Sequence, residues 1–331
     1  MTSFSTTKPL STPLSTPLSP PSSSPPPSSS SSPPSSSPPS SRPSYLTPCT
    51  PSTITALLLH LLPSKTSLHG RYSLSPSPKP TVTLSSLHTY QSSPSWYSAA
   101  AAYWESPENC TPDVSGVLGG FPALSVPDVL GSSDFISRVL GRVEGNGGAV
   151  RCLDLGGGIG RVSKNLLSRY YAKTTMLEVS PRLCKAAEVY LEGVKGVEVV
   201  NEGMEGYDDF GGVGLVWCQW CVGHFSDVDL VAFLRRARVG MEGGGKVVVK
   251  DNTTAEEMFV VDEEDSSVTR CEGLMDAIFE LGGWKRMGRY EMGEWPEELF
   301  PVPIILYGKV GEVGEVGGGA EGPKGAEDKK G

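Results

Sequence analysis

The hydrophobic pattern from residue 149 onward alternates short apolar runs with amphipathic stretches. Residues 149–155 and 174–179 are apolar runs of strand length, and residues 161–172 between them repeat apolar side chains at helical spacing. The predicted strands are 149–155, 174–179, 196–203, 213–220, 244–252, 285–292 and 302–308, and the predicted helices are 161–172, 181–191, 227–238 and 269–283. Strands alternating with helices of this length predict an α/β fold with a doubly wound, largely parallel sheet.

The two ends of the chain have a different composition from its middle. Ser, Pro and Thr dominate the first hundred residues, and a segment of this kind has too few large apolar groups to offset the entropy of ordering it. From Lys309 the chain is rich in glycine. We therefore expect a disordered arm over residues 1–95, one domain over residues 96–308 and a disordered tail over residues 309–331.

Charge divides near the same boundary. Residues 1–104 contain five basic residues and no Asp or Glu, so the rest of the chain carries a formal charge of −14, against −9 overall. An acidic domain disfavours phosphate backbones and favours cationic partners, so we expect a basic peptide as partner and no nucleic acid. The best apolar run, residues 55–62, is far shorter than the roughly 20 residues of a membrane span, so no membrane partner is expected.

The cellular location is open at this stage. Seven cysteines, an odd number without the spacing of a disulfide framework, suggest a reducing compartment. The Ser-rich start without acidic residues is compatible with an organellar transit peptide, although arginine is sparse for one. We expect the cytoplasm or the nucleus, with a plastid or mitochondrion as the alternative.

A glycine-rich loop, "LDLGGGIGR" (153–161), follows the first predicted strand. Gly156 and Gly158 belong to a G-x-G-x-G pattern, and Arg161 stands where the dinucleotide fingerprint needs glycine, which disfavours NAD and FAD. Glu178 ends the second strand, where a carboxylate can accept hydrogen bonds from a ribose diol. Loop and acid together predict an adenosyl ligand, in the pattern typical of class I methyltransferases that use S-adenosylmethionine. The alternative is a tight turn with a solvated glutamate.

The stretch "VWCQWCVGHF" (216–225) raises the question of a metal or redox site. A zinc site usually needs two paired clusters of cysteine or histidine, and no second pair occurs at ligand spacing. A thioredoxin-like motif would be expected near the first strand rather than after the fourth. We therefore expect no metal site, with Cys218 and Cys221 in the wall and core of the domain.

The residues around these cysteines resemble a known family. "CQWCVGH" (218–224) is similar to the Gln-Trp-x-x-Gly-His segment of the eukaryotic protein α-N-methyltransferases, which methylate N-terminal Xaa-Pro-Lys sequences. The resemblance covers residues 97–308 and is carried in the family's order and spacing by "AAAYW" (100–104), "VSGVLGGF" (114–121), "LDLGGGIGR" (153–161), "VKDN" (249–252), "DEEDSSVTR" (262–270) and "WPEELF" (295–300). It implies a Rossmann-like seven-stranded methyltransferase sheet and transfer of a methyl group to the free α-amino group of substrate proteins.

The resemblance also implies a cofactor site for S-adenosylmethionine. Its residues here would be Gly156, Gly158, Arg161, Glu178, Val179, Ser180, Met204, Glu205 and Gln219. Arg161 can meet the methionine carboxylate with two parallel hydrogen bonds. The family's usual acid at the second strand is Asp, and Glu178 is one methylene longer.

The implied catalytic residues are Asn252, which orients the amine, and Asp265 and His224, which accept or relay its proton. The amine must be neutral to attack the sulfonium methyl. With a pKa of about 7.7–8.0, roughly a tenth of an α-amine is unprotonated at pH 7, so little activation is required.

The implied substrate site surrounds a Pro-Lys chain end. Trp220 would stack on the proline, and Leu118 and Leu124 would close an apolar pocket. A hydroxyl at Tyr103 and acceptors at Asp262, Ser267 and Glu298 would meet the polar and basic groups that follow. Two positions depart from the family pattern: Phe300 replaces a tyrosine, and Glu264 replaces an apolar residue.

Other interpretations stay open. Without the resemblance, His224 and Trp220 could be core residues and Asp262–Asp265 a solvated acidic loop. At the level of the whole chain, the alternatives are a class I methyltransferase that acts on another amine, from lysine or a small molecule, and a catalytically silent binding protein.

Overall fold

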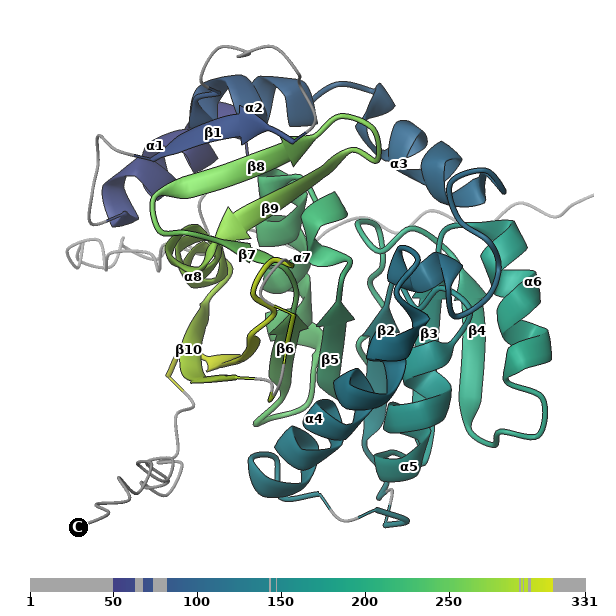
Figure 1. Cartoon of the computed structure of the whole chain (residues 1–331). Helices are drawn as coiled ribbons and strands as arrows, with labels where there is room; N and C mark the ends of the chain where they lie inside the picture. Colours follow the sequence, from purple (N-terminus) through teal and green to yellow (C-terminus); the bar gives the residue numbers. More distant parts are fainter. Residues whose placement is uncertain are drawn as a thin grey trace, which may run out of the picture. The chain divides into compact units, whose positions relative to one another are not determined.

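The computed structural model describes residues 50–62, 68–73, 82–142, 144–146, 148–291, 293, 295–296 and 299–311 (Figure 1). All of them belong to one compact unit of the chain, Pro43–Gly331. The disorder expected for residues 1–49 and 312–331, and the role expected of Glu298, lie outside the described residues. None of the described helices has the length and apolar character needed to cross a membrane.

A seven-stranded sheet forms the centre of the unit. Its strands are β2 (Arg151–Leu155), β3 (Lys173–Glu178), β4 (Val197–Asn201), β5 (Val213–Gln219), β6 (Lys246–Lys250), β10 (Trp284–Tyr290) and β11 (Ile304–Lys309). Their order is β10-β11-β6-β5-β2-β3-β4; the last five are parallel to one another, and β11 is antiparallel to both β6 and β10. The α/β, Rossmann-like sheet predicted from the sequence is confirmed. The chain reverses its winding between β2 and β5, where such sheets bind ligands at the carboxyl ends of their strands.

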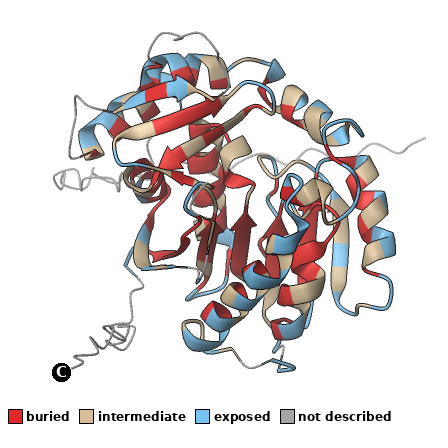
Figure 2. Cartoon of the chain, in the orientation of Figure 1, coloured by how far each residue is buried: buried red, intermediate tan, exposed pale blue. Residues whose placement is uncertain are grey.

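Both faces of this sheet are buried, as Figure 2 shows for its central strands. Because successive side chains of a strand point to opposite faces, Val247 and Val249 of β6 join one apolar cluster while Val248 joins another. The first cluster includes residues of α7 (Asp227–Gly240) and α8 (Glu272–Leu281), and the second includes residues of α4 (Ser125–Arg138), the π-helical turn η4 (Ser163–Leu167) and α5 (Ser168–Tyr170). Helix α6 (Pro181–Tyr190) packs against β3 and β4.

A second, smaller sheet lies beside the first and was not predicted. Its strand order is β1 (His69–Tyr72), β8 (Met258–Asp262), β9 (Ser267–Cys271) and β7 (Thr253–Thr254). Strands β8 and β9 form an antiparallel hairpin, and β1 runs parallel to β8. The helix expected from residue 269 begins only at Glu272, because Thr269 and Arg270 pair with β8 and Cys271 pairs with Thr254 of β7.

Part of the expected arm is folded. Helix α1 (Pro51–Leu61), strand β1 and helix α2 (Leu84–Gln91) precede α3 (Ser95–Glu105), so the expectation of disorder up to residue 95 is wrong for them. Ile54, Leu58 and Leu87 are fully buried in the first cluster, and burial of such side chains stabilises a fold by about 1.5–3 kcal/mol each. Thr83 and Ser86 form a capping box at the start of α2. In this segment Thr50 and Thr83 are the N-caps of α1 and α2, a role that depends on position in the chain and that overall composition does not reveal.

A buried ionic network ties these residues to the rest of the unit. His88 of α2 lies 2.8 Å from Asp227 at the start of α7, and Arg270 of β9 binds the other oxygen of the same carboxylate at 2.6 Å. Thr55 of α1 contacts the second ring nitrogen of His88 at 2.5 Å. The Arg270 guanidinium and His88 outweigh burial and hold the pKa of Asp227 below its usual range. Two elements of the expected arm therefore share one charge network with α7 and β9.

Candidate active site

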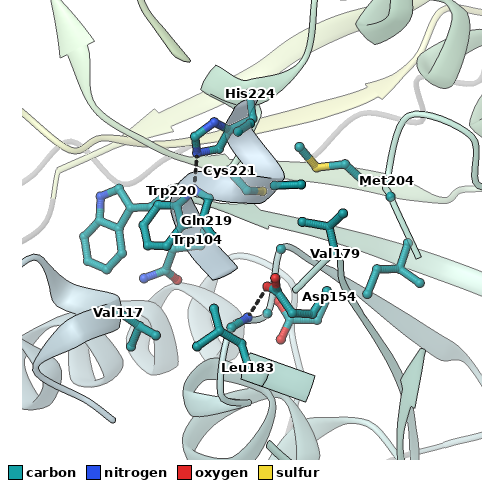
Figure 3. Close-up of a pocket in the computed structure, with 18 of the residues that line it drawn as sticks. Trp104, Val117, Asp154, Val179, Leu183, Met204, Gln219, Trp220, Cys221 and His224 are labelled. Atoms are coloured by element: carbon teal, nitrogen blue, oxygen red, sulfur yellow. Dashed lines mark hydrogen bonds between the residues drawn. The ribbon is translucent and has the colours of Figure 1, made fainter. Parts of the chain in front are cut away.

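A cavity lies at the carboxyl ends of β2, β3 and β5, where the change of winding predicts a ligand (Figure 3). It encloses about 1050 Å³ that no atom occupies, part of it open to solvent. Eight of the nine predicted cofactor residues line it, namely Gly156, Gly158, Arg161, Glu178, Val179, Met204, Glu205 and Gln219. Ser180 does not: its hydroxyl caps α6 by accepting from the Leu183 N–H, and it donates to Glu105.

The glycine loop and Glu178 form one hydrogen-bonded unit. The Gly158 N–H donates to one oxygen of the Glu178 carboxylate at 2.9 Å, and the Ser180 N–H donates to the other at 2.8 Å. Each oxygen keeps a lone pair that can accept a hydroxyl hydrogen. Burial raises the pKa of Glu178. Gly156 has a φ of +59°, and a Cβ there would lie 2.6 Å from Cβ of Cys221, so only glycine fits the turn.

Behind the loop lies a buried cluster of charges centred on Asp128 of α4. The Asp128 carboxylate accepts from Arg161 at 2.7 Å and from the Gln219 amide at 2.9 Å, and it pairs with Lys250 at the end of β6. Burial lowers the pKa of Lys250 to about 8, while the Asp128 carboxylate opposes that shift. Of the two cations, only Arg161 lines the cavity, where its guanidinium suits the carboxylate of an amino-acid-containing cofactor such as S-adenosylmethionine.

A second cavity adjoins the first and encloses about 990 Å³, also partly open. The two share part of their lining, namely Trp104, Val117, Trp220 and His224. The second holds all three predicted catalytic residues and four of the predicted substrate residues: Asn252, Asp265, His224, Leu118, Leu124, Trp220 and Ser267. Phe300 lines it too. A group in the second cavity can therefore meet a group in the first along the shared wall.

His224 sits on that wall with both ring nitrogens engaged. The indole N–H of Trp104 lies 3.1 Å from Nε2, and because an indole only donates, Nε2 is the accepting nitrogen (Figure 3). Nδ1 then carries the hydrogen and faces the Ser266 carbonyl at 3.4 Å. Trp96 donates to the His224 carbonyl at 2.8 Å, so two tryptophans of α3 hold this residue.

Asp265 has one carboxylate oxygen without a partner. In the part of the chain that the structure describes, its buried Oδ1 makes no hydrogen bond. Burial raises the pKa of Asp265, opposed by the nearby His224 and by a hydrogen bond with Ser267. A buried, unsatisfied acceptor is costly unless a ligand completes it. Its place in the second cavity suits a hydrogen-bond donor such as an amine.

Several functional candidates were missed by sequence reasoning. Asp251 lies in the second cavity and accepts from the backbone N–H groups of Val222 and Asn252, at 3.0 and 2.8 Å. Burial raises its pKa to about 6. It thereby ties the segment leading to His224 to the predicted Asn252. The sequence did contain a signal for Lys250 and Asp251, because both are ionisable residues at the end of an apolar predicted strand, in "VKDN" (249–252). Asp128 had none, since it is one acid on an ordinary amphipathic helix.

Two predicted substrate residues stand outside the lining of either cavity. Asp262, at the end of β8, accepts at Oδ2 from the Ser73 hydroxyl at 2.8 Å and at Oδ1 from the Glu264 N–H at 2.9 Å. Tyr103 packs edge-on against Trp104, with ring centroids 5.4 Å apart. Burial and the carboxylates of Asp265, Glu264 and Asp262 raise the pKa of Tyr103, so it faces the acidic turn from α3.

The two cysteines of the C-x-x-C stretch are buried thiols. Hydrogen bonding with Cys218 and burial raise the pKa of Cys221 well above its ordinary value. Its side chain forms the wall against Gly156. Among the residues that the structure describes, no group of three or more His, Cys, Asp or Glu side chains is arranged to hold a metal ion.

Comparison with known proteins gives consistent matches. Residues 92–307 match the family described as AdoMet dependent proline di-methyltransferase. The N-terminal Xaa-Pro-Lys N-methyltransferase 1 of Danio rerio is 34% identical over 215 residues, which cover 64% of this chain and 94% of that protein. The Alpha N-terminal protein methyltransferase 1 of Arabidopsis thaliana is 36% identical over 219 residues, 63% of this chain and 78% of that one. A solved SAM-dependent methyltransferase from Leishmania major superposes with a TM-score of 0.65 at 28% identity, covering 74% of this chain and 98% of that one.

Proposed function

Because this chain belongs to the AdoMet-dependent proline di-methyltransferase family, we propose that it methylates the free α-amino group of proteins that begin with Xaa-Pro-Lys. The enzyme is a class I methyltransferase, and S-adenosylmethionine is its cofactor. The names of its relatives in Danio rerio and other organisms support the Xaa-Pro-Lys substrate.

The cofactor would bind in the first cavity and the substrate in the second. Bound in the first, the cofactor supplies a methyl group activated by a positively charged sulfur. Glu178, with a free lone pair on each oxygen, would accept from the ribose hydroxyls, and Arg161 would meet the methionine carboxylate. The substrate chain end would enter the second cavity and bring its amine to the wall that the cavities share.

One observation carries the proposal: the unpartnered Oδ1 of Asp265 lies in a cavity that adjoins the cofactor cavity. An α-amine presents the N–H donor that this oxygen lacks. Since roughly a tenth of such amines is already neutral at pH 7, the site has only to orient the lone pair and take up one proton. Asp265 takes that proton before His224, because the Nε2 lone pair of His224 already accepts from Trp104.

The remaining lining suits a short Pro-Lys chain end. Leu118, Leu124 and Trp220 offer apolar surface for a proline ring. The acidic residues 262–264 directly precede Asp265 in the chain and suit a basic residue at the third position of the substrate. The formal charge of −14 beyond residue 104 favours approach of basic chain ends in general.

A peptide assay tests the proposal. The wild-type enzyme and S-adenosylmethionine are incubated with peptides that begin Ala-Pro-Lys or Ser-Pro-Lys, and products are read by mass spectrometry. The matched controls are the same peptides with an acetylated α-amine and the Asp265→Asn variant. Methyl groups on the free peptides alone support the proposal. Methylation of the acetylated peptides or of free lysine at equal rate would instead identify another amine as the substrate. Cofactor binding without turnover on any of them would identify a silent binding protein.

For the location, we propose the cytoplasm or the nucleus, with an organelle as the alternative. The odd cysteine count supports it, as do the free thiols of the six cysteines in the described residues. Imaging of a fluorescent fusion of residues 1–95, next to the full chain, distinguishes the two: organellar fluorescence of the fusion would overturn the first.

A further inference from the structure

Residues 50–91 precede the region that matches the family, which begins at residue 92. They nevertheless contact the part of the site that holds Asp265. Strand β1 pairs with β8 over four residues, from His69 with Met258 to Tyr72 with Val261. Without β1, β8 would be the edge of a small sheet in which the only long pairing is the β8–β9 hairpin. Such isolated hairpins are marginally stable in water.

Ser73 continues this pairing into the turn between β8 and β9. Its N–H donates to the Val261 carbonyl at 2.9 Å, and its hydroxyl donates to Oδ2 of Asp262 at 2.8 Å. The other oxygen of Asp262 accepts from the Glu264 N–H inside the turn. One carboxylate thus joins β1 to the backbone of the turn, one residue before Asp265.

Helix α2 reaches the other end of the same turn. Tyr90 lies close to Ser266, a non-glycine residue held at a φ of +53°; burial raises the pKa of Tyr90, and the Ser266 side chain opposes that rise. The Ser266 carbonyl faces Nδ1 of His224. Tyr90 also packs edge-on against Trp96, which donates to the His224 carbonyl. Ser73 therefore binds one end of the turn 262–266 and Tyr90 of α2 lies near the other, with Asp265 between them.

We propose that β1, Ser73 and α2 position the turn 262–266, and that Ser73 is a positioning residue that acts on Asp265 through the Asp262 carboxylate. The expected changes in peptide kinetics rest on the proposed function. The positioning of the turn 262–266 by Ser73 does not depend on the identity of the substrate. The Ser73–Asp262 bond keeps the turn in the conformation that presents the free oxygen of Asp265 to the second cavity.

The first test compares Ser73→Ala with Ser92→Ala. Ser92 also donates a side-chain hydrogen bond, at 2.6 Å to the His88 carbonyl, but it forms no hydrogen bond with the described residues of the hairpin, so it is a matched control. Removal of a hydrogen bond to a carboxylate is expected to reduce kcat/KM for an Ala-Pro-Lys peptide by about 3–10-fold in Ser73→Ala. The dissociation constant for S-adenosylhomocysteine, measured by calorimetry, should stay within about twofold of wild type. Ser73→Thr, which keeps the hydroxyl, should restore the wild-type value.

The pathway through Asp262 is tested by a double-mutant cycle. Asp262→Ala removes both acceptor oxygens, so it should produce a loss at least as large as that of Ser73→Ala. The double variant should then lose no more than Asp262→Ala alone, because Ser73→Ala breaks an interaction that Asp262→Ala has already removed. Additive losses, or equal losses in peptide kinetics and cofactor binding, would overturn the proposal, since either result indicates general destabilisation.

Hydrogen exchange gives a readout that does not depend on activity. The amides of residues 262–266 should exchange faster in Ser73→Ala than in Ser92→Ala and wild type, while those of β2 and β3 remain unchanged. Equal exchange in the two variants overturns the positioning role whatever the substrate is. If the wild-type enzyme fails on Xaa-Pro-Lys peptides but the exchange result holds, the proposed function fails and the positioning role stands.

Discussion

Replacing Asp128 with Asn should destabilise the enzyme strongly, because Asp128 is the shared counter-charge of Arg161 and Lys250. All three side chains are 4% exposed or less. Removing one partner of a buried ion pair typically costs about 3–5 kcal/mol, since it leaves an uncompensated charge. That loss is a large part of the roughly 5–15 kcal/mol by which a domain is stable.

The two cations contribute unequally to this loss. The pKa of Lys250 is about 8, one unit above pH 7, so deprotonating Lys250 at pH 7 costs only about 1.4 kcal/mol. Lys250 can therefore contribute no more than that to the loss of stability, because it can release its proton instead of remaining as an unpaired charge. Arg161 carries the rest. The share of Lys250 also depends on pH. Without Asp128 its native pKa falls further below the unfolded value, so the native variant binds fewer protons than the native wild type below about pH 8. The deficit should therefore be larger at pH 6 than at pH 9.

The assay is thermal unfolding of both proteins at pH 6, 7 and 9. For a folded unit of about 260 residues, 3–5 kcal/mol corresponds to a decrease in Tm of about 6–10 °C at pH 7. The control is Asp134→Asn on the same helix: Asp134 pairs with Arg138 at the surface, where loss of a pair changes stability by less than about 1 kcal/mol. A decrease below about 2 °C for Asp128→Asn, or a deficit that grows with pH, would refute Asp128 as the shared counter-charge.

Three further predictions concern the reaction. Asp265→Asn should lower kcat for an Ala-Pro-Lys peptide by about 10²-fold or more with unchanged calorimetric binding of S-adenosylhomocysteine, because the amide cannot take up the proton; near-normal turnover would contradict its role. Gly156→Ala should weaken calorimetric binding of the same ligand and lower the Tm, because a left-handed residue with a side chain costs about 1–2 kcal/mol and its Cβ overlaps Cys221; unchanged binding would argue against the tight turn. Initial rates at low peptide concentration should rise between about pH 6 and pH 9 and then level off, as the α-amine loses its proton and Asp265 is ionised. A maximum near pH 6 would contradict attack by the neutral amine.

The sequence was sufficient for the main sheet and for most of the expected residues that line the first cavity. Buried parallel strands appear as continuous apolar runs, and the glycine loop has few alternatives once it follows such a strand. Gly156, Arg161 and Gln219 therefore fall where they were expected. The predicted strand 244–252 ends at Lys250 in the structure, because Asp251 and Asn252 turn into the second cavity.

Long-range contacts account for what the sequence did not reveal. Strands β8 and β9 are short and carry the charged motif between them, so neither gave a clear periodic signal. Strand β1 is stabilised by a partner nearly 190 residues away, which no local pattern encodes. The same holds for Asp262, whose charge predicted contact with a basic substrate but whose oxygens bind Ser73 and the Glu264 backbone.

The burial of α1 and α2 in the core has a practical consequence. The folded unit includes α1 from Pro51, whereas the match to the family begins only at residue 92. A fragment trimmed to the region that matches the family would start at residue 92. It would lack Ile54 and Leu58, which α1 inserts beside α7 and α8, and would expose an apolar face prone to aggregation. Expression trials that cut the low-complexity leader should therefore keep every residue from Thr50 onward.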